Sequence, residues 1–224
     1  MVRHVEKTLR GRQILRGVDL EVPPGRLTVI EGGNGAGKTT LIRLCATIVQ
    51  PDAGNVVIDG YDVRGAAGQV RKSIGLVLVN ERSLYWRVSP VENLAVFGRL
   101  RGLPAGVIRE RTSSLLEELE LAHLANERVG RLSTGQRQRL MIARALLADA
   151  PVLLIDEPLR GLDEDGVVVV LELLARRARE GAAVLVAAPL VGDLVPLAHA
   201  HVRLLDGVLA PAADLPAPAG AAST

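Results

Sequence analysis

The stretch that decides the fold reads Val29-Ile30-Glu31-Gly32-Gly33-Asn34-Gly35-Ala36-Gly37-Lys38-Thr39-Thr40-Leu41-Ile42. The apolar run before it, residues 27–30, predicts a buried strand, and a helical pattern begins at Lys38. The spacing between them is G-x-x-x-x-G-K-T, whose glycines let successive backbone N–H groups point at a phosphate. The helix adds its positive N-terminal end to the same place. A glycine-rich turn that happens to precede a lysine is the alternative, but the flanking strand and helix favour a loop that binds a nucleoside triphosphate.

Individual roles follow from the residue types in this loop. The ammonium of Lys38 would reach the β- and γ-phosphates, and the hydroxyl of Thr39 would bind Mg²⁺. The expected nucleotide contacts are Gly32, Gly33, Asn34, Gly35, Ala36, Gly37, Lys38, Thr39 and Thr40.

The composition allows one large domain, or one core with a smaller insertion. The chain has 224 residues, 48% of them hydrophobic and 2% aromatic, so Leu, Val, Ile and Ala must fill the core. The longest uncharged apolar stretch, residues 181–192, is shorter than the roughly 20 residues that cross a bilayer. The single cysteine, Cys45, is expected to be buried and inert. A net charge of +2 does not argue for nucleic acid, and we expect a cytoplasmic protein.

Apolar runs and turn residues predict an α/β fold. Strands are expected at residues 2–6, 17–22, 27–30, 74–79, 152–155, 183–187 and 202–205, with a hairpin over residues 56–63 around Asp59-Gly60. Helices are expected at residues 38–49, 90–101, 107–119, 135–148, 164–180 and near 192–198, with Ser89 as the N-cap of the second. Strands and helices alternate at both ends of the chain, which favours a mostly parallel sheet interrupted by a helical insertion at about 81–149. The Ala- and Pro-rich tail, residues 210–224, is expected to be disordered.

Two carboxylates end the strand expected at residues 152–155. In folds with parallel strands the binding site lies at the carboxyl ends of the strands. Asp156 would therefore hold Mg²⁺, and Glu157 would orient and deprotonate the attacking water. A solvated turn is the common reading of such a pair in isolation, but the phosphate loop upstream favours the catalytic one.

A third motif, Leu132-Ser133-Thr134-Gly135-Gln136, opens a helix about twenty residues before that strand. Its simplest reading is an N-cap made by Ser133 or Thr134. The same geometry offers a hydroxyl, free N–H groups and a positive helix end to an anion.

Together these motifs resemble the ATPase subunit of ABC transporters, of the export-type, ABC-2-like subfamily. The resemblance rests on the phosphate loop, the Leu132–Gln136 signature, Asp156-Glu157-Pro158 and Gly161-Leu162-Asp163, in that order along the chain. It implies a P-loop NTPase core with a mostly parallel sheet, an antiparallel β subdomain and an inserted α-helical subdomain, all within one domain at residues 1–209. It also implies ATP and Mg²⁺ as ligands.

The resemblance further implies a head-to-tail dimer that holds ATP between subunits and drives an integral-membrane permease from the inner face of the membrane. Ser133 and Gly135 of one subunit would face the phosphate loop of the other, and Gln136 and Asn80 are further expected nucleotide contacts. Whether the dimer is a homodimer or a heterodimer stays open. The segment 81–94 resembles the region that serves export-type permeases, and its Tyr85 and Trp86 either lie at the permease surface or pack within the insertion.

Four positions depart from the family pattern. Pro189 stands where the family has a histidine that contacts the γ-phosphate, and none of the four histidines falls on the site in this alignment. The Q-loop glutamine falls on Asn80, or on Val79 in a shifted register. An aromatic that stacks on adenine aligns with Leu9, where Arg10 or Arg12 could cover the base instead. Arg160 replaces a serine.

These departures bear on turnover and not on nucleotide binding, because Lys38, Thr39, Asp156 and Glu157 all remain. We expect slow ATP hydrolysis, or a need for a second, more complete ATPase subunit. A hydrolysis-impaired regulatory module is the alternative, and a soluble ABC ATPase outside transport is a weaker one. A GTPase would need an N-K-x-D motif, which the chain lacks.

Overall fold

The structure, a computed structural model, describes residues 1–78 and 84–211. Its first sheet is antiparallel, with the strand order β2-β1-β4-β5. These strands are β1 (Val2–Leu9), β2 (Arg12–Leu20), β4 (Ala53–Ile58) and β5 (Tyr61–Asp62). The hairpin between β4 and β5 turns at Asp59 and Gly60, whose φ angles are 50° and 79°. Two positive φ angles are typical of the tight hairpin turns that Asp-Gly favours, which confirms the hairpin.

The second sheet has six strands in the order β10-β9-β3-β8-β7-β6. They are β3 (Leu27–Glu31), β6 (Ile74–Val77), β7 (Val152–Asp156), β8 (Ala183–Ala188), β9 (Ala200–Leu205) and β10 (Val208–Pro211). All are parallel except β10, which pairs antiparallel with β9. Glu31 pairs with Ala188, and Asp156 pairs with Ala187. The carboxyl ends of β3, β7 and β8 therefore meet at one edge of the sheet.

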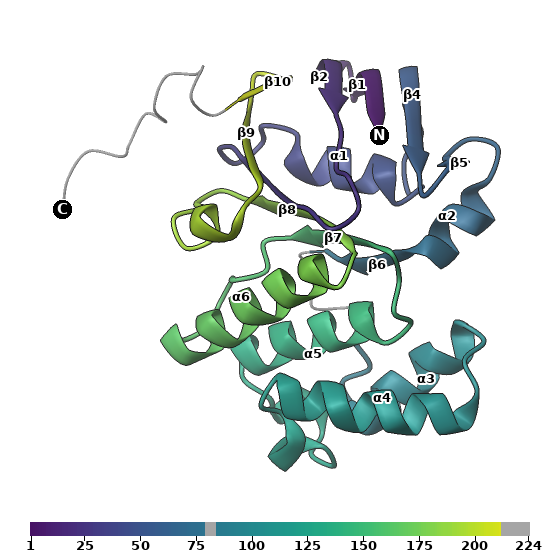
Figure 1. Cartoon of the computed structure of the whole chain (residues 1–224), viewed down its shortest axis with the longest axis vertical. Coiled ribbons are helices and arrows are strands. Elements are labelled where there is room, and N and C mark those ends of the chain that lie inside the picture. Colours follow the sequence, from purple (N-terminus) through teal and green to yellow (C-terminus); the bar gives the residue numbers. More distant parts are fainter. Residues whose placement is uncertain (79–83, 212–224) are drawn as a thin grey trace.

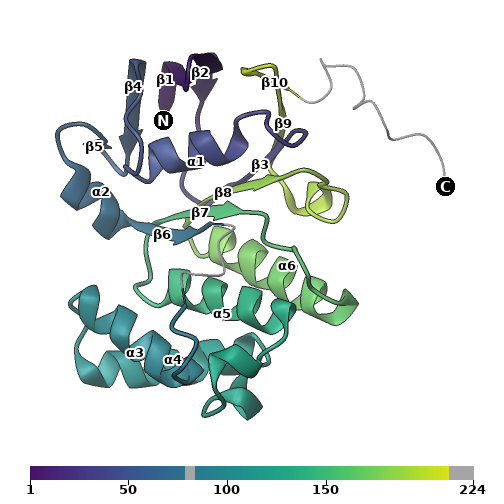
Figure 2. The same cartoon turned by 180° about the vertical axis from the view of Figure 1, so that it is seen from behind.

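Helices cover both faces of this sheet (Figure 1). On one face α1 (Lys38–Cys45) lies between the two sheets, and α2 (Ala67–Ser73) precedes β6. On the other face α5 (Thr134–Leu146) and α6 (Glu164–Arg179) lie side by side, as Figure 2 also shows. The helices α3 (Pro90–Leu100) and α4 (Ala105–Glu118) pack farther out, against α5. The expected helical segment between β6 and β7 is thus built from α3, α4 and α5.

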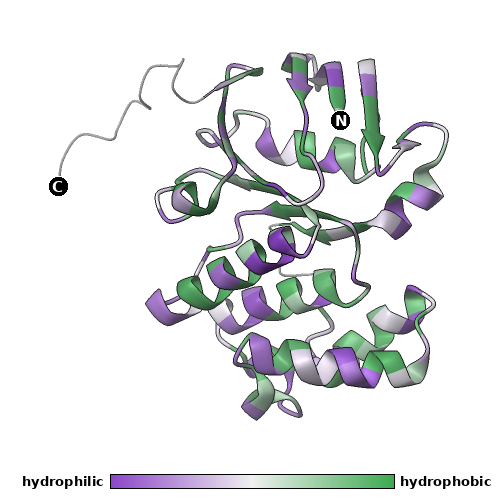
Figure 3. Ribbon diagram, viewed as in Figure 1, coloured by the Kyte–Doolittle hydropathy of each residue, from purple (hydrophilic) through white to green (hydrophobic). Residues whose placement is uncertain are grey.

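Strand periodicity divides the core into two clusters, one on each face of the parallel sheet. Val29 and Val186 belong to the cluster that contains α5 and α6, whereas their neighbours Ile30 and Leu185 belong to the cluster that contains α1. Side chains alternate between the two faces along a strand, so a strand buried on both faces must be apolar throughout. Figure 3 shows this pattern, with hydrophobic strands at the centre and hydrophilic residues on α4 and α6. Cys45 lies in the second cluster, and burial raises the pKa of its thiol to about 12, which agrees with an inert role.

The second expected helix of the chain begins as its sequence predicts. Ser89 accepts a hydrogen bond from the backbone N–H of Glu92, and the Glu92 carboxylate accepts one from the backbone N–H of Ser89. This capping box, with Pro90 at the first helical position, fixes the start of α3. The bond from the Ser89 backbone N–H, together with one from the Ser89 hydroxyl to the same carboxylate oxygen, keeps the pKa of the Glu92 carboxyl below its usual value.

Three expectations on local structure are wrong. The phosphate-loop helix ends at Cys45 and not near residue 49, because Thr47 takes a left-handed conformation with φ 62°. The helix expected near 192–198 is a single 3₁₀ turn, η4 (Val195–Leu197). Ala210 and Pro211 belong to β10, so the ordered chain extends past the expected start of the tail; residues 212–224 lie outside the described part. Within the described ranges, no helix combines the length and apolar character needed to cross a membrane.

Candidate nucleotide-binding site

The phosphate loop connects β3 to α1 at the carboxyl edge of the parallel sheet. Gly37 is the N-cap of α1, with φ 109°, and no side chain caps the free N–H groups of the first turn. A Cβ at Gly37 would lie 3.0 Å from Leu15 Cδ2 and 3.2 Å from the Ile14 carbonyl oxygen, so the conformation and the space both require glycine. The loop therefore presents an uncapped, positive helix end, which is a suitable site for an anion.

Lys38 points back into this loop. Its side chain is buried, and its Nζ donates hydrogen bonds to the carbonyl oxygens of Gly32 (2.5 Å) and Gly33 (3.1 Å). Burial lowers the pKa of the Lys38 ammonium, and the charges of Asp156 and Glu157 act in the opposite direction. The loop thus wraps around the Lys38 ammonium, which lies near the carboxylates of Asp156 and Glu157 at the end of β7.

Thr39 and Asp156 form a pair at the foot of the loop. Thr39 Oγ1 donates a hydrogen bond of 2.7 Å to Asp156 Oδ2, and Asp156 is only 1% exposed. The other carboxylate oxygen, Asp156 Oδ1, is buried without a hydrogen-bond partner among the described residues. Burial raises the pKa of Asp156, the bond from Thr39 opposes that shift, and the charge of Glu157 adds to it. A hydroxyl beside an unpaired carboxylate oxygen is a donor set that suits Mg²⁺.

Glu157 follows Asp156 in a left-handed conformation, with φ 49°. Its backbone N–H donates to the Ala187 carbonyl oxygen (2.7 Å), which ties the turn to β8. Its carbonyl oxygen accepts a hydrogen bond of 3.1 Å from Gln138 Nε2, which also donates to the Pro158 carbonyl oxygen (3.2 Å). Gln138 is buried and holds the Glu157 turn from α5, a role that no local sequence pattern indicates.

The signature segment begins α5, and the structure decides which residue caps it. Ser133 Oγ accepts a hydrogen bond from the Gln136 backbone N–H (3.1 Å), and Gln136 Oε1 accepts one from the Ser133 backbone N–H (2.8 Å). Ser133 is therefore the N-cap, and the amide of Gln136 completes a capping box. Because Ser133 Oγ accepts in this cap, its own hydroxyl proton stays available for donation to an anion.

A close backbone contact joins the signature segment to the loop before α6. A Cβ at Gly135 would lie 2.7 Å from the Gly161 carbonyl oxygen, and a Cβ at Gly161 would lie 2.9 Å from Thr134 Cγ2. Asp163 then caps α6 by accepting from the Gly166 backbone N–H at 2.9 Å. Both glycines are thus needed for close packing, and the loop 161–163 is held beside Ser133.

Two of the positions that depart from the family pattern, Pro189 and Arg160, lie at this edge. Pro189 directly follows β8, where it offers no backbone donor, and Arg160 is exposed in the turn after Glu157. Leu9 is partly exposed at the end of β1, next to the turn formed by Arg10 and Gly11. Asn80 and Val79 lie outside the described residues.

One histidine, His201, pairs with the residue that precedes the phosphate loop. His201 Nε2 lies 3.0 Å from Glu31 Oε2, and Arg203 Nη2 lies 3.2 Å from the same oxygen. Glu31 is the residue immediately before Gly32, so this cluster fastens β9 to β3 where the phosphate loop begins. His201 and Glu31 are 170 residues apart in the sequence, and the pairing of β9 with β3 brings them together.

Tyr85 and Trp86 both pack within the insertion, and each is also about half exposed. Tyr85 stacks on Phe97 with ring centroids 5.7 Å apart. The guanidinium of Arg137, one residue after the signature segment, lies 5.0 Å from the centre of the Trp86 ring.

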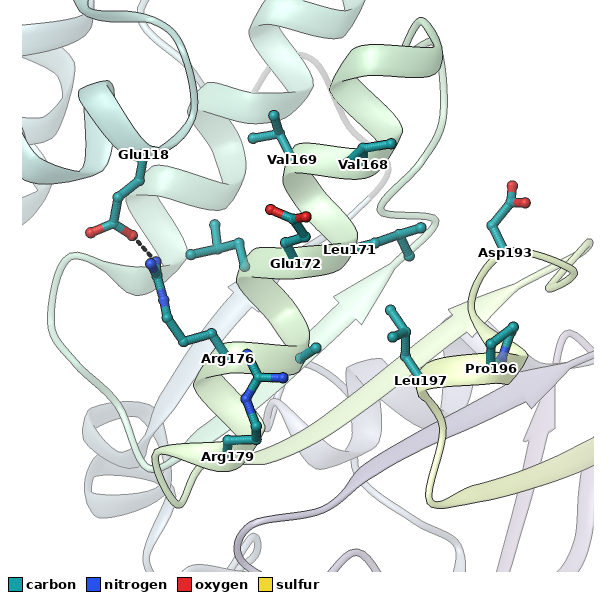
Figure 4. A pocket seen from close by; sticks show the side chains of 12 residues that line it. Glu118, Val168, Val169, Leu171, Glu172, Arg176, Arg179, Asp193, Pro196 and Leu197 are labelled. Carbon is teal, nitrogen blue, oxygen red and sulfur yellow. Dashed lines mark hydrogen bonds and ion pairs between the residues drawn. The ribbon is translucent and has the colours of Figure 1, made fainter.

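A groove of about 630 Å³ lies away from the phosphate loop, between α6 and the segment 193–197 (Figure 4). Leu171 and Leu197 face each other across it, and Glu118 pairs with Arg176 at one side. None of the phosphate-loop residues lines it. The nucleotide site is therefore not this groove but the shallow edge of backbone N–H groups and charged side chains described above.

Comparisons with known proteins agree with this geometry. A family model described as "ABC transporter" matches residues 15–160. The chain is 34% identical over 193 residues to the ABC transporter ATP-binding protein NatA of Bacillus subtilis (strain 168), covering 86% of this chain and 78% of that protein. It is 41% identical over 161 residues to the daunorubicin resistance ATP-binding protein DrrA3 of Streptomyces coeruleorubidus, covering 72% of this chain and 51% of that protein. Several relatives are thus considerably longer than the part that this chain matches.

Solved structures give the same assignment. A dimeric ATP-binding cassette, MJ0796, bound to ADP and Pi, superposes with a TM-score of 0.85 at 25% identity, covering 94% of this chain and 97% of that chain. An ATP-binding subunit of an ABC transporter superposes with a TM-score of 0.86 at 25% identity, covering 95% of this chain and 90% of that chain. The chain therefore belongs to the ABC transporter family, as one of its ATP-binding subunits.

Proposed function

We propose that this subunit hydrolyses ATP in a head-to-tail dimer and thereby drives an integral-membrane permease that exports its substrate. The observation that carries the proposal is the convergence of Lys38, the Thr39–Asp156 pair and Glu157 at one edge of the sheet. The dimeric MJ0796 cassette bound to ADP and Pi supports both the dimer and the hydrolysis.

Within one subunit, the chain's own groups divide the chemistry of hydrolysis. The free N–H groups of the loop and the Lys38 ammonium would hold the β- and γ-phosphates. Thr39 and Asp156 would hold Mg²⁺, which offsets phosphate charge when it is bound. Glu157 would accept a proton from the water that attacks the γ-phosphorus, and ADP would leave as phosphate forms.

The other half of the site would come from the second subunit. The Ser133 hydroxyl would donate a hydrogen bond to the γ-phosphate of the partner's ATP. The free N–H groups of Thr134 and Gly135 would add the positive charge of the helix N-terminus. Gln136 would act by fixing Ser133, because its amide is already used in the capping box.

The direction of transport is inferred from relatives. Relatives include doxorubicin resistance and Nod factor export ATP-binding proteins, although a sulfate/thiosulfate import protein is 39% identical over 167 residues.

We infer that Tyr85 and Trp86 contact the permease, which would place the subunit at the inner face of the membrane. We also propose one ATPase domain that extends through β10 to Pro211, with the helical insertion at about 81–149. A hydrolysis-impaired module is not favoured, since the four hydrolytic side chains are present.

Replacement of Glu157 by Gln tests the proposal. The variant keeps the side-chain shape but cannot accept the water proton, so it should retain ATP and stay dimeric in ATP and Mg²⁺. The mass of the purified protein, measured by light scattering after size-exclusion chromatography, should double on addition of ATP. The double variant Glu157→Gln, Lys38→Ala should stay monomeric, because it lacks the ammonium that holds the phosphates. A single variant that remains monomeric at saturating ATP would contradict the sandwich.

A further inference from the structure

Arg160 is an exposed cation in the turn that links β7 to α6. Its backbone N–H donates to the Glu157 carbonyl oxygen (3.3 Å), which positions the residue three places after the proposed catalytic base. Among residues 1–78 and 84–211, no side chain or carbonyl group hydrogen-bonds or ion-pairs with its guanidinium. By contrast, Arg137, Arg139, Arg176 and Arg177 all have such partners. The guanidinium of Arg160 is thus a donor that the subunit itself leaves unused.

Packing places this cation beside the signature segment. Arg160 immediately precedes Gly161. A Cβ at Gly135 would meet the Gly161 carbonyl oxygen, and a Cβ at Gly161 would meet Thr134 Cγ2, so the two segments are in close contact. Ser133 and Arg160 are both exposed. The turn that carries Arg160 therefore packs against the first turn of α5, next to Ser133, and both segments present exposed residues there.

This surface, formed by Ser133, Gly135 and Arg160, has the chemistry of a phosphate contact. Ser133 has a hydroxyl proton to donate, the first turn of α5 contributes positive charge, and a guanidinium presents parallel N–H groups that match two phosphate oxygens. The nearby carboxylate of Asp163 is already engaged with the backbone of α6. The surface consequently carries donors for an anion that the subunit does not itself supply.

We propose that Arg160 binds the terminal phosphate of the ATP held by the phosphate loop of the partner subunit. This proposal rests on the head-to-tail dimer proposed above, in which Ser133 faces that phosphate. Arg160 is then a catalytic residue supplied across the interface. It adds positive charge at the γ-phosphate, where Pro189 of the subunit that holds the nucleotide contributes no donor. As the transferred phosphoryl group moves toward water, the guanidinium neutralises the charge that develops on its oxygens, as arginine residues supplied across an interface do in other nucleotide hydrolases.

The test separates a contact across the interface from one within the subunit. In the Glu157→Gln background, Arg160→Ala should raise the ATP concentration for half-maximal dimerisation at least tenfold, and Arg160→Lys should raise it less. ATP affinity measured with a fluorescent analogue, at protein concentrations too low for dimers, should not change. In the protein that retains Glu157, Arg160→Ala should lower kcat at least tenfold.

Arg109→Ala is the matched control, since it removes one exposed arginine from α4, away from the surface of Ser133 and Arg160. It should match its parent in dimerisation and in kcat. Normal dimerisation and kcat in Arg160→Ala would overturn the proposal while leaving the sandwich intact. A tenfold loss of ATP affinity in the monomer would also overturn it, by placing the contact within the subunit. Failure of the parent Glu157→Gln to dimerise would overturn the sandwich and this contact together.

Discussion

Gln138 should be required for hydrolysis although it cannot touch ATP. Replacing it by Leu removes two hydrogen bonds to the carbonyl oxygens of Glu157 and Pro158 from a buried position. Each bond contributes about 1 kcal/mol, and leaving the buried Pro158 carbonyl without a donor costs about 1–3 kcal/mol. The free energy of unfolding should therefore fall by about 2–4 kcal/mol. For a chain of this size that corresponds to a Tm lower by about 4–16 °C.

The effect on catalysis should exceed the effect on stability. Glu157 holds a left-handed backbone, which is strained in a residue with a side chain, and the Gln138 amide is one of the contacts that maintain it. Once released, the carboxylate should move by about 1 Å or more, and a displacement of that size can lower kcat about 10²-fold. ATP affinity should stay the same, because Lys38 and Thr39 are untouched. Steady-state hydrolysis at a temperature where the variant is folded measures kcat and KM separately.

Asn93→Leu is the matched control for this experiment. Asn93 is also fully buried, and its Nδ2 donates to two backbone carbonyl oxygens, those of Tyr85 and Ser89, both at 3.0 Å. Its Oδ1 also accepts a hydrogen bond from the Tyr85 backbone N–H (2.8 Å), so its loss should lower the Tm by at least as much. The basal kcat of the purified subunit should stay within about twofold, since these side-chain partners all lie in residues 85–89. If Gln138→Leu loses stability but keeps the parental kcat, the reasoning that this amide positions Glu157 is refuted.

Two further predictions concern the same edge of the sheet. Pro189→His should raise kcat about 10²-fold by restoring a donor and proton carrier at the γ-phosphate; an unchanged kcat with nucleotide still bound would contradict the assignment of that position. Asp156→Asn should abolish hydrolysis yet raise the Tm of the nucleotide-free subunit at pH 7, because burial raises the pKa of Asp156 and its ionised form therefore opposes folding. The folded state binds this proton more tightly than the unfolded state, so the parent should lose stability as the pH rises from the ordinary Asp value through the raised one. Asp156→Asn should lack this loss of stability, and a Tm below that of the parent at pH 7 would contradict the prediction.

The sequence predicts the parallel core well because its signals are local and strong. The apolar runs at β3, β7 and β8 predict buried strands, and the Ser89 capping box and the Asp59-Gly60 turn are confirmed. The helix α2 was not predicted because its N-terminus has no side-chain cap, and it is held instead by burial of Val70. The strand β10 did carry a signal, the Asp206-Gly207 turn with φ angles of 46° and 80°, but the Ala- and Pro-rich composition that follows obscured it.

The residues of the site also divide into those with a local sequence signal and those without one. Motif spacing predicts that Lys38, Thr39, Asp156 and Glu157 converge, since all lie at the carboxyl ends of parallel strands, and the structure brings them together. Spacing could not predict Gln138 or His201. Their roles depend on which backbone groups face them from distant segments, and that is set by tertiary packing.

The helix α5 gives a physical reason why the two halves of the ATP site should act together. Its first residues carry Ser133, which we place at the partner's nucleotide, and one turn later Gln138 holds the turn of Glu157, which serves the subunit's own nucleotide. The contact between Gly135 and Gly161 leaves no room for α5 to move without moving that turn, because close-packed backbone transmits displacement and does not absorb it. Closure of Ser133 onto ATP at one site should therefore reposition Glu157 at the other. In the proposed dimer, two ATP molecules at opposite ends of the interface would thus be linked through a single rigid helix in each subunit.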